Sequence, residues 1–159
     1  MKIPKIYLET TIFNFYFADD APDKKADTLE LFQEIKNGKY APYTSAYVLR
    51  EINKAPEPKK SQMLDLLKIY NINSLDAGDE VERLADVYIK ESIIPLKYST
   101  DALHIASATV SDLDFIVSYN FKHIVKRQTI MMTEVVNLRE NYKRIGIFSP
   151  AEVIEYDDD

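Results

Sequence analysis

Hydrophobic and polar positions along the chain fall into two alternating patterns. Short runs rich in β-branched and aromatic residues, typical of buried strands, occur at residues 5–9, 40–43, 113–117 and 146–148. Apolar residues at helical spacing occur between them, at residues 24–37, 45–52, 63–70, 76–91, 99–111 and 126–142. Strands that alternate with helices need crossover connections, which predict a parallel sheet covered by helices on both faces. The pattern therefore predicts an α/β protein.

Polar side chains follow two of the predicted strands. Glu9 ends the first strand and is followed by Thr10 and Thr11, which we interpret as the start of a loop, and Asn120 follows the strand at 113–117. The carboxyl ends of parallel strands meet at one edge of a sheet, where the functional groups of α/β proteins gather. The sequence therefore predicts that Glu9 and Asn120 belong to one site.

The length and composition are those of one folded domain. The chain has 159 residues and 46% apolar content, with no repeat or linker, so we predict a single domain over residues 1–156 and a solvated acidic tail at 157–159. No signal-peptide core and no segment of membrane-spanning length is present, which favours a cytoplasmic protein without a membrane partner. The net charge of −6 argues against binding nucleic acid by bulk attraction to phosphates, although carboxylates that hold metal ions would contribute to such a charge.

The residue types restrict the chemistry that the chain can carry. Without cysteine, the sequence excludes thiolate zinc sites, iron–sulfur clusters and a cysteine nucleophile, and it has only two histidines. Its three glycines form no phosphate-binding loop for a nucleotide cofactor. Carboxylates and water suffice for Mg²⁺ or Mn²⁺, and such an ion can orient a phosphodiester and stabilise charge on its oxygens. A metal site with oxygen ligands is therefore the favoured chemistry.

Four segments, in order along the chain, resemble the successive motifs of the PIN-domain family. They are IYLETT (6–11), SAYVLREI (45–52), TDALHIASA (100–108) and FIVSYNFKHI (115–124). The resemblance spans nearly the whole chain and implies a three-layer α/β/α sandwich with a central parallel sheet. It also implies an endoribonuclease dependent on Mg²⁺ or Mn²⁺, as in the VapC-like toxins of toxin–antitoxin pairs, with RNA as substrate and an antitoxin protein as partner. We also expect a homodimer.

The resemblance implies a role for each of four residues. Glu9, Glu51 and Asp101 match the acids that hold metal in the family, and Asn120 stands where many members carry a fourth acid. These four form the expected catalytic set. Glu9 extends the usual carboxylate by one methylene, and Asn120 lacks a charge. These departures favour one alternative function, a catalytically weakened PIN-like domain that binds RNA or a protein. A receiver-type phosphoryl-transfer domain is a weaker alternative, because it needs a nucleophilic Asp at the end of the first strand.

Residues near these acids are candidates for binding the substrate. Thr10 could hydrogen-bond a phosphate, although capping the following turn is an equal alternative. A local basic run could contact substrate phosphates, or could be a solvated loop and helix start. The run comprises Lys122, His123, Lys126 and Arg127.

Other polar and aromatic residues are interpreted as structural. His104 lies one turn after Asp101 and could face the site, but we interpret it as a hydrogen-bonded histidine at a helix interface, the more frequent case. The aromatic segment 13–17 is interpreted as core or subunit interface, because no basic residue interleaves it as in a base-stacking platform. Capping remains an alternative role for each acid, since Asp and Glu favour the first turn of helices.

Overall fold

A parallel sheet forms the centre of the molecule. The computed structural model describes residues 2–156, so the predicted tail at 157–159 lies outside the described residues. Five strands pair in the order β3-β2-β1-β4-β5. Their bounds are β1 (Lys5–Leu8), β2 (Ala41–Ser45), β3 (Asn73–Leu75), β4 (Phe115–Val117) and β5 (Gly146–Phe148). Ile6, Tyr7 and Leu8 of the central strand are fully buried, because both faces of a parallel sheet are covered.

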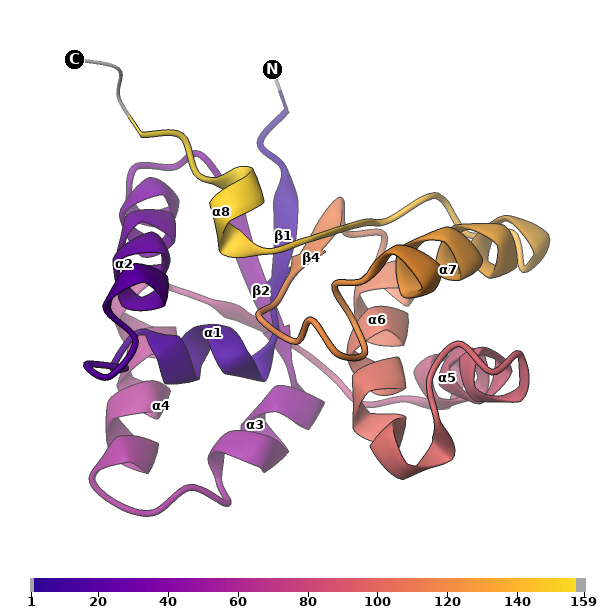
Figure 1. The fold of residues 1–159 in the computed structure, drawn as a ribbon, viewed down its shortest axis with the longest axis horizontal. Coiled ribbons are helices and arrows are strands. Elements are labelled where there is room, and N and C mark those ends of the chain that lie inside the picture. Colours follow the sequence, from indigo (N-terminus) through magenta and orange to yellow (C-terminus); the bar gives the residue numbers. More distant parts are fainter. Residues whose placement is uncertain (1, 157–159) are drawn as a thin grey trace.

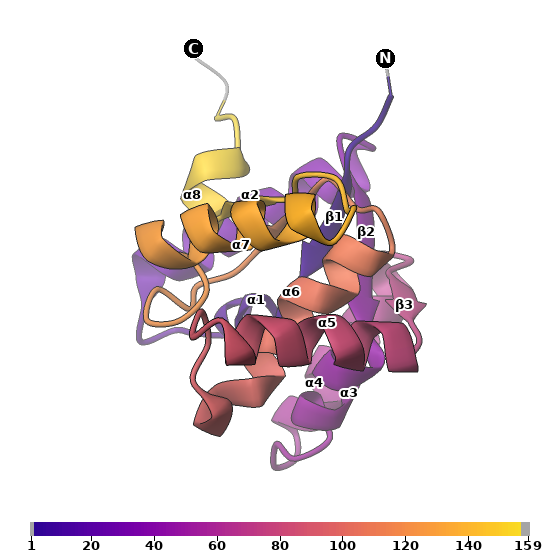
Figure 2. The same cartoon turned by 90° about the vertical axis from the view of Figure 1, so that its right-hand side faces the viewer.

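Helices lie on both sides of this sheet (Figure 1). One side carries α1 (Thr10–Phe15), α2 (Pro22–Lys36), α3 (Ala46–Ile52) and α4 (Lys59–Ile69). The other carries α5 (Asp79–Lys90), the 3₁₀ turn η1 (Leu96–Tyr98), α6 (Ser99–Val110) and α7 (Arg127–Arg139), with α5 packed against α6 (Figure 2). The short α8 (Pro150–Val153) contacts α2. This arrangement confirms the predicted three-layer α/β/α sandwich.

The strand order contains a switch point at its two central strands. From β1 the chain passes outward to β2 and β3, and then returns to the opposite side of β1 to form β4 and β5. The connections that leave β1 and β4 therefore go to different layers. Such a switch point opens a crevice at the carboxyl ends of the two central strands, the usual place for a site in this class of sheet.

Two elements differ from the sequence expectation. The loop predicted after Glu9 is the helix α1, which Glu9 caps and which the buried side chains of Ile12 and Phe13 anchor to the core. Aromatic residues have modest helix propensity, and six residues are too few to show a helical period. The edge strand β3 was not predicted, because Asn73 and Ser74 are exposed and lack a hydrophobic pattern. Among the helices of residues 2–156, none has the length and apolar content needed to cross a membrane.

Candidate functional site

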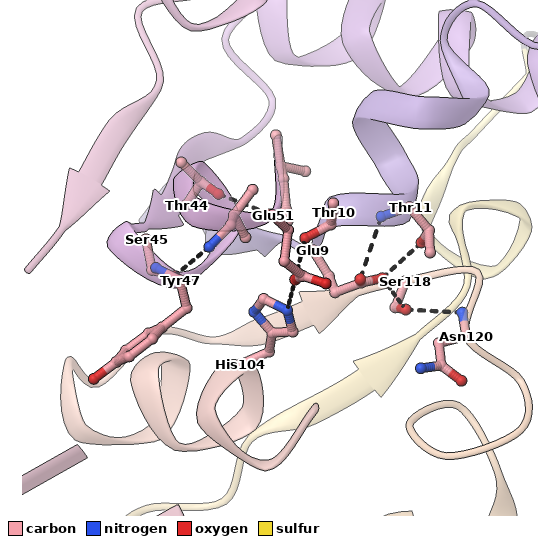
Figure 3. Close-up of polar contacts among 12 residues, drawn as sticks. Glu9, Thr10, Thr11, Thr44, Ser45, Tyr47, Glu51, His104, Ser118 and Asn120 are labelled. Carbon is pink, nitrogen blue, oxygen red and sulfur yellow. Dashed lines mark hydrogen bonds and ion pairs between the residues drawn. The ribbon is translucent and has the colours of Figure 1, made fainter. Parts of the chain in front are cut away.

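Glu9 lies at the carboxyl end of β1 and caps α1. Its Oε2 accepts a hydrogen bond from the backbone N–H of Thr11 (3.2 Å), and its Oε1 accepts the hydroxyl groups of Thr11 (2.6 Å) and Ser118. The side chain is 3% exposed, so these donors take the place of water around the carboxylate. Each of these hydroxyls also accepts a hydrogen bond from the loop after β4. The backbone N–H of Tyr119 donates to Thr11 (2.9 Å), and the backbone N–H of Asn120 donates to Ser118 (2.9 Å; Figure 3). The loop is thereby fastened to Glu9.

Glu51 reaches the same crevice from α3. Its Oε1 accepts hydrogen bonds from the hydroxyl of Thr10 and from Nε2 of His104, both at 2.6 Å (Figure 3). Burial alone would raise the pKa of Glu51, but the hydrogen bond and charge of His104, with the hydrogen bond from Thr10, outweigh burial and lower this pKa. Both donors go to Oε1, which leaves Oε2 available to a cation.

A buried chain of hydrogen bonds fixes the donor to Glu51. The Oγ of Ser45 accepts the first backbone N–H groups of α3 (3.1 and 3.3 Å), so its own proton points to the hydroxyl of Tyr7 (2.7 Å). Tyr7 then donates to Nδ1 of His104 (2.7 Å), and Nε2–H of His104 donates to Glu51. A neutral imidazole protonated on Nε2 satisfies every step. The expectation of a hydrogen-bonded histidine is therefore confirmed, and the histidine also belongs to the site.

Burial and the neighbouring carboxylates have opposite effects on the pKa of His104. Burial alone would lower the pKa of His104, but its hydrogen bond to Glu51 and the negative charges of the carboxylates raise this pKa. A cation among the carboxylates would offset their charges and favour the neutral form that the hydroxyl chain requires.

Asp101 brings a third carboxylate from the first turn of α6. Burial raises the pKa of Asp101 to about 6, and the charges of Glu9 and Glu51 act in the same direction. The charge of His104 and a hydrogen bond from Asn120 act against them. Asn120 therefore supports the charge of Asp101, whereas an acid at this position would repel it.

The donor set fits a hard divalent cation. Ligand atoms of Glu9, Glu51 and His104 lie within 4.8 Å of one another, a spacing suited to one ion. His104 directs Nε2 at Glu51, so it serves the carboxylate, while Asp101 adds a third carboxylate within electrostatic reach. Three carboxylates without a thiolate suit Mg²⁺ or Mn²⁺. The structure thus groups two of the predicted ligands, Glu9 and Glu51, with His104, which the sequence indicated only by its place after Asp101. Asp101 lies outside this group and is linked to it by the electrostatic effect of Glu9 and Glu51 on its pKa.

The predicted basic run lies at the end of the loop at 118–126, which passes between α1 and α6 (Figure 1), and continues into the first residue of α7, Arg127. The backbone N–H of His123 donates to Oδ1 of Asn120 (3.0 Å), and its ring stacks on Tyr98 with the centroids 4.0 Å apart. The side chains of Lys122, Lys126 and Arg127 are exposed, and Lys126 is the N-cap residue of α7. The loop therefore presents positive charge next to Asn120. Thr10, the remaining predicted substrate contact, instead donates to Glu51.

The aromatic segment 13–17 has two roles. Phe13 is fully buried, as predicted, but Phe15 is partly exposed, and Nζ of Lys24 lies 5.0 Å from its ring centroid. No basic residue interleaves the segment itself, but Lys24 of the next helix supplies a positive charge at Phe15. Lys24 is nine positions from Phe15 and reaches it from the next helix, so no local pattern could have indicated the contact.

Comparison with solved structures supports the fold. The chain is similar to one in the crystal structure of VapBC2 from Rickettsia felis bound to a DNA fragment from their promoter, with a TM-score of 0.53 and 18% sequence identity. The match covers 91% of this chain and 98% of that chain. No protein-family model matches the sequence, and no curated protein is significantly similar to it. The resemblance of the four motifs is thus accompanied by a PIN-like fold.

Proposed function

We propose that the protein is a metal-dependent endoribonuclease that hydrolyses RNA phosphodiester bonds. The observation that carries this proposal is the grouping of Glu9, Glu51 and His104 at the switch point of a PIN-like sheet. Asp101 lies close enough for the charges of Glu9 and Glu51 to act with burial in raising its pKa to about 6. Carboxylates crowded in this way repel one another, and a divalent cation relieves the repulsion.

Each residue of the site has a separate task in this function. Glu9, Glu51 and Asp101 would hold Mg²⁺ or Mn²⁺, which when bound supplies positive charge for the phosphate and makes water a better nucleophile. Thr10 and His104 fix the orientation of Glu51 through two hydrogen bonds of 2.6 Å. Asn120 completes the catalytic set by holding Asp101 with its amide. The basic run Lys122, His123, Lys126 and Arg127 would pair with substrate phosphates.

The structural neighbour supports a partner for this enzyme. The name VapBC2 denotes a pair of proteins. The chain shares its fold with one chain of that structure over nearly the full length of both. We therefore include in the proposal that the protein is the toxin of a toxin–antitoxin pair, acting as a homodimer. Co-expression with the product of an adjacent small reading frame should give a stable complex with reduced RNA cleavage, and light scattering should give the mass of two chains for the free protein.

RNA cleavage by matched variants tests the catalytic proposal. Purified protein should cut an end-labelled RNA in the presence of Mn²⁺ and stop on addition of EDTA. Asp101→Asn should lose roughly a hundredfold or more in rate, because even residues that only support a metal ligand typically cost 10–100-fold. Asp65→Asn is the matched control, since Asp65 is an exposed carboxylate on α4. Unchanged cleavage by Asp101→Asn would refute the assignment.

A catalytically weakened domain that binds RNA or protein is the second candidate. It is favoured by the three donors that already occupy the carboxylate of Glu9 and by the neutral Asn120. Calorimetry separates the two candidates. Binding of Mn²⁺ below millimolar concentration supports the enzyme, whereas no binding by the folded protein supports the weakened domain.

A further inference from the structure

Two groups of aromatic rings and lysines lie near the carboxylates. In the first group, Nζ of Lys24 lies 5.0 Å from the ring centroid of Phe15, 5.9 Å from that of Tyr119 and 5.8 Å from that of Phe121. The ring of Phe121 is half exposed, at 50%. A lysine within 6 Å of three rings marks a place where positive charge and an accessible aromatic face occur together.

The second group surrounds Tyr98, which is partly exposed at the end of η1. One face of this ring stacks on His123, with an interplanar angle of 30°. The Nζ atoms of Lys97 and Lys122 lie 5.8 and 5.9 Å from its centroid. Rings and lysines are therefore interleaved here as well.

The two groups are attached to different helical layers. The hydroxyl of Tyr119 donates to the backbone carbonyl of Lys24 (2.9 Å), which ties the first group to the first turn of α2. Tyr98 precedes Asp101 by three residues and leads into α6, in the other helical layer (Figures 1 and 2). Phe121 directly follows Asn120 in the loop between these layers. The loop that carries Asn120 therefore links the two groups, with Phe121 in the first and Lys122 and His123 in the second.

We propose that these groups are two nucleotide subsites, in which unpaired bases stack on Phe121 and on Tyr98 while the lysines pair with the flanking phosphates. This inference rests on the proposed function, and it adds that the RNA must be single-stranded on both sides of the reacting phosphate. Base stacking on an aromatic ring requires an unpaired base, which a duplex does not offer. With a net charge of −6 the chain has no bulk attraction for RNA, so local contacts of this kind must supply the affinity.

Binding without metal tests the subsites independently of cleavage. Fluorescence anisotropy in EDTA would use a labelled 12-nucleotide RNA with no self-complementarity, alone and annealed to its complement. The wild-type protein should bind the single strand at least roughly tenfold more tightly than the duplex. Phe121→Leu should weaken binding of the single strand by roughly five- to thirtyfold, whereas Phe121→Trp should retain or strengthen it, because a larger aromatic face stacks better.

The contribution of Lys24 has a matched control on the same helix. Lys36 is exposed at the other end of α2, about 18 Å away at 1.5 Å per residue. Lys24→Gln should weaken binding a few-fold and reduce its salt dependence, while Lys36→Gln should leave both unchanged.

Three outcomes would overturn the subsites: equal affinity for single strand and duplex, no effect of Phe121→Leu, or equal effects of the two lysine variants. These failures are distinct from failure of the proposed function. If cleavage depends on Asp101 but the binding variants have no effect, the proposed nuclease function is supported and the proposed subsites are refuted. If the binding variants behave as expected but no RNA is cut, the proposed subsites are supported and the proposed nuclease function is refuted.

Discussion

Replacing Asp101 with asparagine should stabilise the ion-free protein while removing its response to Mn²⁺. The rise in the pKa of Asp101 from 3.8 to about 6, caused first by burial and then by Glu9 and Glu51, means that the folded protein disfavours the charged carboxylate. At about 1.4 kcal/mol per pKa unit the upper limit is ~3 kcal/mol. Asp101 is partly exposed, so solvent screening reduces this to about 1–2 kcal/mol. For a chain of this length, such a gain raises Tm by roughly 2–6 °C.

The pH dependence of this gain identifies its cause. Well above pH 6, Asp101 is charged in the folded and the unfolded chain, so the wild-type protein carries the full penalty. As the pH falls through about 6, the folded protein takes up a proton and the penalty shrinks, and it is lost once the unfolded chain is protonated as well, below about 3.8. The advantage of Asp101→Asn should therefore be largest at pH 8 and nearly absent at pH 4.

Thermal unfolding followed by circular dichroism in EDTA, at pH 8 and pH 4, measures the difference. Asp65→Asn serves again as the control, and it should change the free energy of unfolding by less than about 0.5 kcal/mol at both pH values. Added Mn²⁺ should raise the Tm of the wild-type protein and of Asp65→Asn, but not that of Asp101→Asn. Destabilisation by Asp101→Asn at pH 8, or a gain of the same size at both pH values, would refute the electrostatic argument.

Three further changes probe the neighbouring groups. The affinity for Mn²⁺ should fall as the pH drops below about 6, since a proton on Asp101 competes with the ion; calorimetry that finds the same affinity at pH 7.5 and 5.5 would exclude Asp101 as a ligand. Tyr7→Phe leaves the buried Nδ1 of His104 without its donor, which should cost about 1–3 kcal/mol in urea unfolding and weaken Mn²⁺ binding roughly tenfold. A loss of stability with unchanged Mn²⁺ binding would make His104 purely structural. Glu9→Asp shortens the side chain by one methylene and should increase Mn²⁺-dependent RNA cleavage, whereas slower cleavage would show that the site requires the longer side chain.

The sequence predicted those parts of the site that depend on the order of the elements. Glu9 and Asn120 follow neighbouring parallel strands, so their meeting requires only the register between β1 and β4, in which Leu8 pairs with Val117. Glu51 and Asp101 were placed by motif resemblance; Glu51 lies in the last turn of α3 and Asp101 in the first turn of α6, close enough for the charge of Glu51 to raise the pKa of Asp101. Periodicity also predicted most of the helices, because an amphipathic helix has apolar residues at regular spacing along the sequence.

Contacts between distant side chains could not be predicted in this way. Tyr7 and His104 are 97 positions apart, and their hydrogen bond depends on the packing of α6 against the central strand. The residues on either side of Tyr7, Ile6 and Leu8, are buried and apolar, so nothing nearby in the sequence marks Tyr7 as functional. The association of Lys24 with Phe121 likewise needs the loop at 118–126 to fold back onto α2.

The longer side chain at position 9 has a consequence that the sequence alone left open. The carboxylate of Glu9 caps its own helix at Thr11, and its Oε1 also accepts the hydroxyl of Ser118. The two hydroxyls that donate to Glu9 also accept the backbone N–H groups of Tyr119 and Asn120. The same two hydroxyls therefore hold both the carboxylate and the loop in place. A cation that drew Glu9 away from its cap would loosen both hydroxyls, and the loop would have to adjust with them. The extra methylene therefore acts less on the reach of the carboxylate than on its coupling to the loop, which explains why charge and spacing alone could not determine whether this departure weakens the site.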